Sequence, residues 1–214
     1  MTAIKICGVT RPEDANLAVD LGAWAVGINL WAPSPRSVPL EQAVELGALL
    51  KRRTQTVGVF VNPTLEEVAK AVEDVQLNMV QLHGDEGSHF CAEVARKTGA
   101  KVIKAFPVTS LAAVQGAEAF RTDYHLFDTV APDSVRGGTG QTFDWSHLAK
   151  RHSEVPLILA GGISPDNVRE AIESTNPFAV DVASGVESSP GIKDEDLMRS
   201  LFEAAGSPAA AAGA

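Results

Sequence analysis

Short apolar segments rich in β-branched residues recur along the chain and alternate with segments of helical periodicity. The apolar segments are residues 3–7, 25–31, 56–61, 78–83, 101–106, 124–129, 156–161 and 178–183. Because they are apolar on both faces, they predict strands that are buried on both sides. The helical segments are residues 12–23, 39–53, 63–74, 86–99, 111–120, 143–152, 164–175 and 193–205.

This alternation predicts a parallel sheet with right-handed crossovers. The repeat of about 20–30 residues is close to a barrel of about 250 residues divided by eight. We therefore expect a single (β/α)8 TIM barrel over residues 1–205, followed by a low-complexity C-terminal tail at residues 206–214. An open doubly wound sheet is the alternative, but no GxGxxG motif follows the first predicted strand.

In a barrel of this kind, the strand C-termini and the loops after them carry the chemistry. Two such loops are rich in small residues: one contains Gly161 and Gly162, the other Ser184 and Gly185. Small residues let backbone N–H groups approach an anion, and loops seven and eight of barrels often hold phosphate. Each loop alone could be a plain turn, whereas the two together favour phosphate binding. A third glycine loop, residues 136–145, lacks the lysine of a P-loop and suits an active-site loop better than a nucleotide site.

Two strand ends carry side chains suited to proton transfer. Cys7 ends the first strand directly before Gly8, and Asp128 ends the otherwise apolar sixth strand. Cys7 is either a small buried residue or a catalytic thiol, and Asp128 is either a structural acceptor or a general acid or base. A free thiol with a pKa near 8.5 is only partly ionised at neutral pH, so we expect nearby dipoles or cations to favour the thiolate of a catalytic cysteine.

Three further polar side chains are candidates for substrate binding. Arg36 lies in the proline-stiffened stretch WAPSPRSV, where it is either a surface charge or a bidentate partner for an anion. Asp181 lies inside the eighth strand and serves either neighbouring backbone or the hydroxyls of a ligand. His83 follows the fourth strand, and a metal site with Asp85, His89 and Cys91 is disfavoured because that run crosses into a helix and shows no strong zinc spacing.

Composition narrows the classes of partner. The formal net charge is −9, and the longest basic run is Lys51-Arg52-Arg53, which disfavours nucleic acids and membrane surfaces. The two cysteines form no CxxC motif, no apolar run approaches the length of a membrane span, and the first residues lack a signal-peptide pattern. We therefore predict a soluble, cytoplasmic protein. A serine hydrolase has little support, because no GxSxG motif surrounds Ser184.

An ordered set of motifs along the chain closely resembles the phosphoribosylanthranilate isomerase family of tryptophan biosynthesis. The motifs are KICGVT, GINLWAPSPRSV, VGVFVN, VQLHGDE, LFDT, GGTGQTFDW, LAGGISPDNV and DVASGVESSPGIKD, and they span Lys5 to about Asp194. Each motif alone is weak, but their order is specific. The one departure is ASGVE, where family members often read SSGVE, and the serine next to the glycine is kept.

The resemblance implies a (β/α)8 barrel that uses no cofactor or metal and performs an Amadori rearrangement of N-(5′-phosphoribosyl)anthranilate. It implies that Cys7 is the general base, that Asp128 is the general acid, and that Arg36 binds the anthranilate carboxylate. The phosphate is expected at Gly161-Gly162 and Ser184-Gly185. Asp128 would protonate the furanose oxygen to give a Schiff base, and Cys7 would remove the C2′ proton to give an enolamine that tautomerises to the ketone.

Two alternatives remain open at this stage. The related isomerase of histidine biosynthesis performs similar chemistry but has an aspartate where Cys7 stands. A non-catalytic barrel that binds a phosphorylated ligand is the other, although loss of Cys7 or Asp128 would be expected there. The family resemblance admits a monomer or a homodimer.

Overall fold

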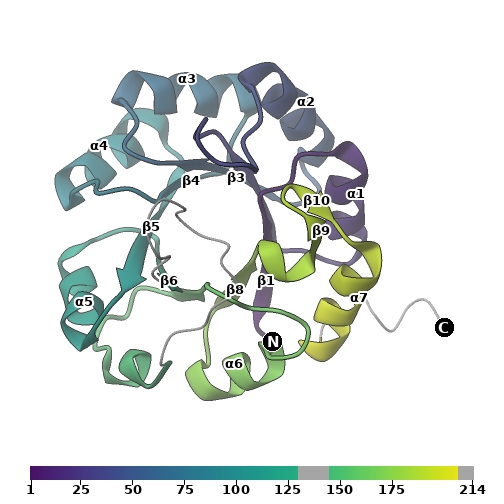
Figure 1. Ribbon diagram of the computed structural model, residues 1–214. Coiled ribbons are helices and arrows are strands. Elements are labelled where there is room, and N and C mark those ends of the chain that lie inside the picture. Colours follow the sequence, from purple (N-terminus) through teal and green to yellow (C-terminus); the bar gives the residue numbers. More distant parts are fainter. Residues whose placement is uncertain (130–144, 207–214) are drawn as a thin grey trace.

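The computed structural model describes residues 1–129 and 145–206, and it shows a closed barrel of parallel strands (Figure 1). The strands are β1 (Ala3–Cys7), β2 (Ala25–Asn29), β3 (Gln55–Phe60), β4 (Met79–Leu82), β5 (Lys101–Val108), β6 (Tyr124–Thr129), β7 (Leu157–Leu159) and β8 (Ala179–Val182). Strand β8 pairs with β1 from Ala3↔Ala179 to Ile6↔Val182, and this pairing closes the ring. The predicted (β/α)8 barrel is confirmed, and the open sheet is wrong.

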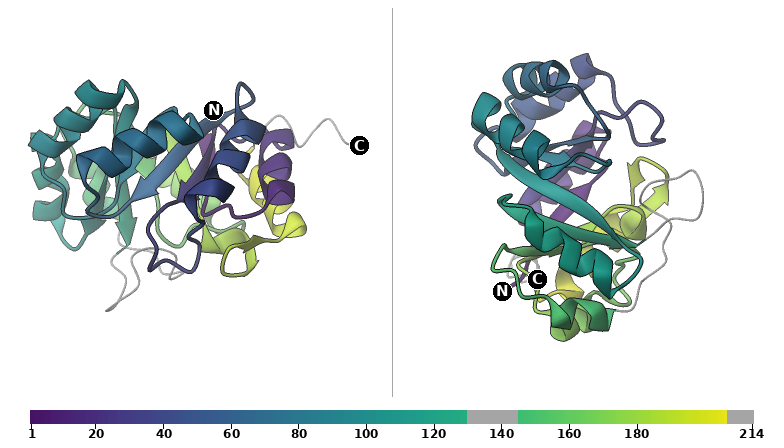
Figure 2. Two further views of the ribbon diagram at one scale, coloured as in Figure 1. Left: turned by 90° about the horizontal axis from the view of Figure 1, so that it is seen from above. Right: turned by 90° about the vertical axis from the view of Figure 1, so that its left-hand side faces the viewer.

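Helices surround the barrel and cover its outer face (Figures 1 and 2). They are α1 (Pro12–Asp20), α2 (Leu40–Leu50), α3 (Leu65–Val75), α4 (Ser88–Thr98), α5 (Leu111–Gly116), α6 (Val168–Thr175) and α7 (Glu195–Ala204). Pro12 stands in the first turn of α1, and Gly22, just past its end, has a φ of 88°. None of the helices in the described ranges combines the length and apolarity that crossing a membrane requires.

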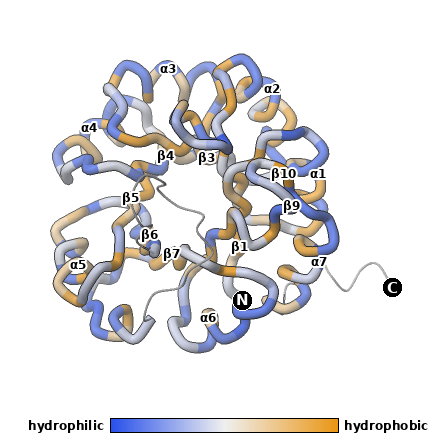
Figure 3. Tube along the Cα trace, in the orientation of Figure 1, coloured by the Kyte–Doolittle hydropathy of each residue, from blue (hydrophilic) through white to orange (hydrophobic). Residues whose placement is uncertain are grey.

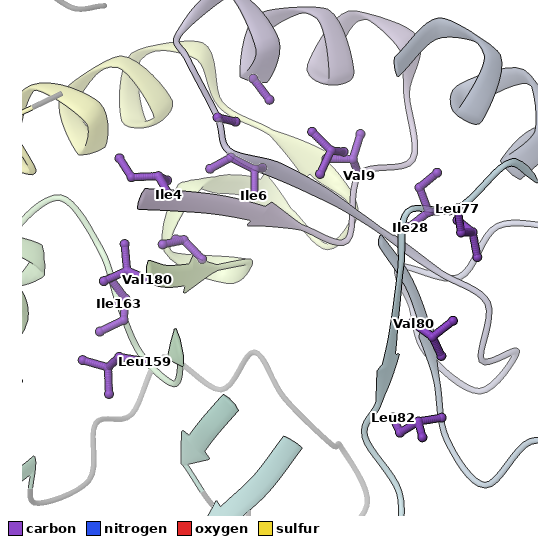
Figure 4. Close-up of a cluster of buried hydrophobic side chains, with 14 of the residues drawn as sticks. Ile4, Ile6, Val9, Ile28, Leu77, Val80, Leu82, Leu159, Ile163 and Val180 are labelled. Atoms are coloured by element: carbon purple, nitrogen blue, oxygen red, sulfur yellow. The ribbon is translucent and has the colours of Figure 1, made fainter. Parts of the chain in front are cut away.

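Strand alternation separates two apolar layers. Ile4 and Ile6 of β1 belong to the large cluster between sheet and helices, together with Val180 and Leu159 (Figure 4). Residues such as Val57, Met79 and Ile158 form a second, smaller cluster. The strands are mostly apolar, and polar residues lie on the outer parts of the helices (Figure 3). Residues 3, 5 and 7 of β1 must face opposite to Ile4 and Ile6, into the barrel.

Three sequence predictions of helices need correction. The described part of the segment after β6 is a 3-10 helix, η2 (Trp145–Lys150), and residues 143–144 lie outside the described residues. The segment 111–120 divides into α5 and a 3-10 helix, η1 (Ala117–Ala119). Helix α6 begins only at Val168, because Asn167 binds the backbone of Ser164 and Gly162 in a turn before it.

A hairpin that the sequence did not predict follows β8. A 3-10 helix, η3 (Ser184–Val186), leads into two short antiparallel strands, β9 (Glu187–Ser189) and β10 (Ile192–Lys193), before α7. These strands are too short to show a period-two pattern, so only the turn residues Pro190 and Gly191 mark them in the sequence. The hairpin lies beside β1 and α1 (Figure 1) and supplies buried charges to the site.

Candidate active site

A pocket lies at the C-terminal ends of the strands and gathers nearly all the predicted site residues. It is lined by Cys7, Gly8, Asn29, Ser34, Arg36, Val59, Gln81, His83, Asp128, Ala160, Gly161, Gly162, Ile163, Asp181, Ala183 and Ser184. The prediction that these strand ends converge is thus confirmed. Gly185 is the one predicted residue outside this lining. We refer to this cavity as the mouth pocket.

Cys7 lies at the end of β1, where Gly8 turns the chain with a φ of 69°. A Cβ at Gly8 would lie 2.5 Å from Cδ of Arg36, so the glycine lets the arginine stem pass directly over the turn. Burial and the negative charge of Asp181 raise the pKa of the Cys7 thiol, although Lys5 and Lys193 act in the opposite direction. The cations expected to favour the thiolate are therefore present, but burial and Asp181 outweigh them.

Asp128 is the residue before the last of β6, and its carboxylate makes two polar contacts. Its Oδ1 accepts a hydrogen bond from the Thr129 N–H at 2.7 Å, and its Oδ2 lies 3.3 Å from Nε2 of His83. On the other side of the imidazole, Nε2 of Gln81 lies 3.1 Å from Nδ1. When the Gln81 amide donates, Nδ1 accepts and the ring proton lies on Nε2, directed at Asp128. The pocket thus orients a carboxyl group through a histidine.

A buried ion pair holds the loop that carries His83. Lys104 Nζ donates to the carbonyl oxygens of Leu82 and Gly84 at 3.2 and 2.7 Å, and it pairs with Glu86 at 2.9 Å. Glu86 in turn accepts from the Asn62 backbone N–H at 2.7 Å. Because every one of these groups is tied to backbone, the end of β4 has a fixed conformation.

Arg36 is buried and held from behind by the hairpin. Its Nε and Nη2 donate to the two carboxylate oxygens of Glu187, at 2.9 and 2.7 Å. Lys193 Nζ also donates to Glu187, at 2.8 Å, and to the carbonyl oxygens of Cys7 and Ala183. Although burial opposes the charged form, Arg36 and Lys193 together lower the pKa of Glu187. Glu187 thus occupies the Nε–Nη2 edge of the guanidinium, and Arg36 also lines the mouth pocket.

The two glycine loops pack directly against their neighbours. A Cβ at Gly161, which has a φ of 87°, would lie 2.1 Å from Oγ1 of Thr129 and 2.8 Å from Oδ1 of Asp128. A Cβ at Gly185 would lie 1.9 Å from the carbonyl oxygen of Ile163. Glycine is therefore required at both positions, because any side chain would separate the loop after β7 from Asp128 or from the loop after β8. Gly185 supports the pocket from behind the lining.

Other predicted residues lie apart from the pocket. The side chain of His89 is 88% exposed, and Cys91 is buried in α4, so both diverge from His83 as predicted. Burial raises the pKa of the Cys91 thiol to about 11. The predicted active-site loop at residues 136–145, apart from Trp145, and the predicted tail beyond Gly206 lie outside the described residues.

The site residues predicted from the sequence did not include several polar residues that the structure places there: Lys5, Asn29, Ser34, Gln81, Glu187 and Lys193. Lys5 and Gln81 had a usable signal, because each is a polar residue at an inward position of an apolar strand. Glu187 and Lys193 had none, because the hairpin that buries them was not predicted.

Comparison with known proteins agrees along nearly the whole chain. A sequence profile described as N-(5′-phosphoribosyl)anthranilate (PRA) isomerase matches residues 4–204. A curated N-(5′-phosphoribosyl)anthranilate isomerase from Geobacter metallireducens is 45% identical over 205 residues, covering 96% of this chain and 99% of that protein.

Solved structures give the same result. The phosphoribosyl anthranilate isomerase from Thermotoga maritima superposes with a TM-score of 0.89 at 42% identity, covering 96% of this chain and 99% of that one. A phosphoribosyl anthranilate isomerase solved with reduced 1-(o-carboxyphenylamino)-1-deoxyribulose 5-phosphate gives a TM-score of 0.84 at 37% identity, with the same coverage. The family resemblance read from the motifs is thus confirmed, and the chain belongs to the N-(5′-phosphoribosyl)anthranilate isomerase family.

Proposed function

We infer that this chain catalyses the isomerisation of N-(5′-phosphoribosyl)anthranilate to 1-(2-carboxyphenylamino)-1-deoxyribulose 5-phosphate in tryptophan biosynthesis. Family membership over residues 4–204 supports this reaction. The observation that carries it is the meeting of Cys7 and Asp128, from the ends of β1 and β6, in one pocket. The relative solved with the reduced carboxyphenylamino compound supports the assignment of the ligand class.

Asp128 is the general acid and Cys7 the general base in this proposal. Asp128 gives its proton to the furanose oxygen as the C1′–O bond breaks, which leaves a Schiff base. The Cys7 thiolate then removes the C2′ proton, and the resulting enolamine takes a proton at C1′ and loses the proton of its C2′ hydroxyl to become the ketone. Strands β7 and β8 separate β6 from β1 in the ring. This spacing supports a mechanism in which Asp128 and Cys7 act on the sugar from two different sides.

The remaining groups bind the two anionic ends of the substrate. Arg36 takes the anthranilate carboxylate with the part of its fork that Glu187 leaves free. The backbone at Gly161-Gly162 and Ser184-Gly185 takes the phosphate, supported by the tight packing of these loops. His83 orients Asp128, and Asp181 lies at the pocket wall next to Cys7. None of these steps calls for a cofactor.

The partner is thus a small phosphorylated molecule. We propose that the enzyme works in the cytoplasm, which fits its two unpaired cysteines. The sequence interpretation as a monomer or a homodimer stays a prediction.

Turnover of freshly made phosphoribosylanthranilate, followed by loss of its fluorescence, tests the function. We expect rapid turnover by the wild type, a loss of at least about a hundredfold in Cys7→Ser and in Asp128→Asn, and full activity in Cys91→Ser. Cys91→Ser is the matched control because it changes the other cysteine, which is buried in α4. A folded wild-type protein without turnover, or a folded Cys7→Ser or Asp128→Asn variant with near-wild-type rates, would refute the assignment. Turnover of the histidine-pathway aminoaldose instead would favour the alternative isomerase.

A further inference from the structure

Lys5 is a buried charge inside the barrel that the proposed reaction does not use. Its side chain is fully buried, and strand alternation places it on the same inward face of β1 as Cys7, two residues along. Its register partner on β8 is Asp181. Nζ of Lys5 donates to Oδ1 of Asp181 at 2.7 Å, so the ammonium is paired and its protonated form is retained: although burial acts against it, Asp181 and Cys7 together raise the pKa of Lys5.

The same ammonium reaches the thiol. A Cβ at Gly27, on the neighbouring strand β2, would lie 2.8 Å from Sγ of Cys7 and 3.1 Å from Nζ of Lys5. The two groups therefore converge over the one position of β2 that has no side chain, and the charge of each favours the charged form of the other. Lys5 thus lies beside the reacting atom of the proposed base and is bonded to a carboxylate at the pocket wall.

We propose that Lys5 is a positioning residue for the general base: its ammonium holds the Cys7 thiol over Gly27 and balances the thiolate charge when the proton leaves. This inference rests on the proposed function of Cys7. Asp181 has the opposite effect on the thiol, because it keeps the ammonium in place but adds a negative charge next to Sγ. Within this ion pair, Lys5 therefore favours the thiolate of Cys7, and Asp181 favours the protonated thiol.

The other charged groups around Cys7 do not replace Lys5. Lys193, from β10, binds the carbonyl oxygen of Cys7 rather than its sulfur and is shared with Glu187. Arg36, from the loop after β2, is paired with the same Glu187. Asp128 and His83 line the pocket from β6 and from the loop after β4, and they contact each other. Among the described residues, Lys5 and its ion-pair partner Asp181 therefore both shift the pKa of Cys7. Neither Glu187, the partner of Lys193 and Arg36, nor His83, the partner of Asp128, is among the charges that shift it most.

The pH dependence of Cys7 alkylation by iodoacetamide, measured without substrate in a Cys91→Ser background, tests this role. Because Lys5 favours the thiolate, Lys5→Met should raise the apparent pKa of the reaction by about one unit or more, a tenfold loss of thiolate at a given pH. Asp181→Asn should lower the apparent pKa. Lys104→Met is the matched control, since it breaks a different buried lysine pair, with Glu86, and should leave the titration of Cys7 unshifted.

Opposite shifts in the two variants separate this role from a merely structural one, because loss of packing has no reason to move the titration in both directions. An unshifted titration in folded Lys5→Met, or shifts of the same sign in Lys5→Met and Asp181→Asn, overturns the proposal. If Lys5→Met does not fold, Asp181→Asn decides alone: a lowered value supports the pair and any other result refutes it. Since no substrate is used, turnover by the wild type alongside a failed titration would refute Lys5 and leave the proposed function standing.

Discussion

The contact between Gly185 and the loop after β7 allows a sharp prediction. In Gly185→Ala the new Cβ would start 1.9 Å from the carbonyl oxygen of Ile163 and 3.0 Å from Cα of Ser164. Both neighbours are backbone, so no side chain can rotate away. Reaching an ordinary carbon contact of about 3.5 Å needs a displacement of roughly 1.5 Å between the two loops that we assign to the phosphate.

The magnitude follows from this displacement. Misplacement of a binding group by about 1 Å costs on the order of a hundredfold in rate, so kcat/KM should fall by about that factor or more. Overpacking should also lower the free energy of unfolding by about 1–3 kcal/mol. If the loops bind phosphate, the inhibition constant of inorganic phosphate should rise together with the KM of the substrate.

Two glycine variants serve as controls in the same assays. In Gly47→Ala the new Cβ would start 2.2 Å from the carbonyl oxygen of Val75, between α2 and the end of α3, so it should lower the unfolding free energy without changing phosphate inhibition. Gly116 has nothing within 4 Å of its Cβ position, so Gly116→Ala should be close to neutral in both measurements. Folded Gly185→Ala with wild-type phosphate inhibition and unchanged kcat/KM would show that these loops do not hold the phosphate.

Two ionisable groups give pH predictions. Because burial and Asp181 raise the pKa of Cys7, the rate of its alkylation by iodoacetamide in Cys91→Ser should climb about tenfold per pH unit from neutral pH until it passes the ordinary range of a cysteine; a rate that levels off below about pH 8.5 would contradict the raised pKa. Burial lowers the pKa of His125 to about 4, whereas the unfolded chain binds a proton near 6.5, so the unfolded state holds more protons between these values. The free energy of unfolding should therefore fall, by at most about 3 kcal/mol, as the pH drops through this window. In urea titrations His125→Gln should lose this acid sensitivity and exposed His89→Gln should keep it; equal sensitivity in both would contradict the assignment.

The hydrophobic pattern was sufficient to predict the barrel, because strands and helices each leave a short-range periodicity in the sequence. The apolar strands and their helical neighbours specify a barrel, and the strand ends of Cys7 and Asp128 then have to meet at one rim. Helix boundaries were predicted well where a local signal exists, as at Pro12, and poorly where a side chain binds its own turn, as at Asn167. The unpredicted hairpin of β9 and β10 is held by Lys193 and Glu187, whose contacts are with distant strand ends.

The sequence by itself thus determined the barrel, the family and half of the residues that line the mouth pocket, because these follow from periodicity and from side chains placed at strand ends. Only the tertiary structure decided how those residues are charged and held. Lys5 meets Asp181 at a separation of 176 residues, and Arg36 meets Glu187 at 151. Such pairs are produced by barrel closure and by the hairpin, and the electrostatic effect of burial on Cys7 depends on both. A motif names the thiol, but its pKa is a property of every charge and every buried surface around it.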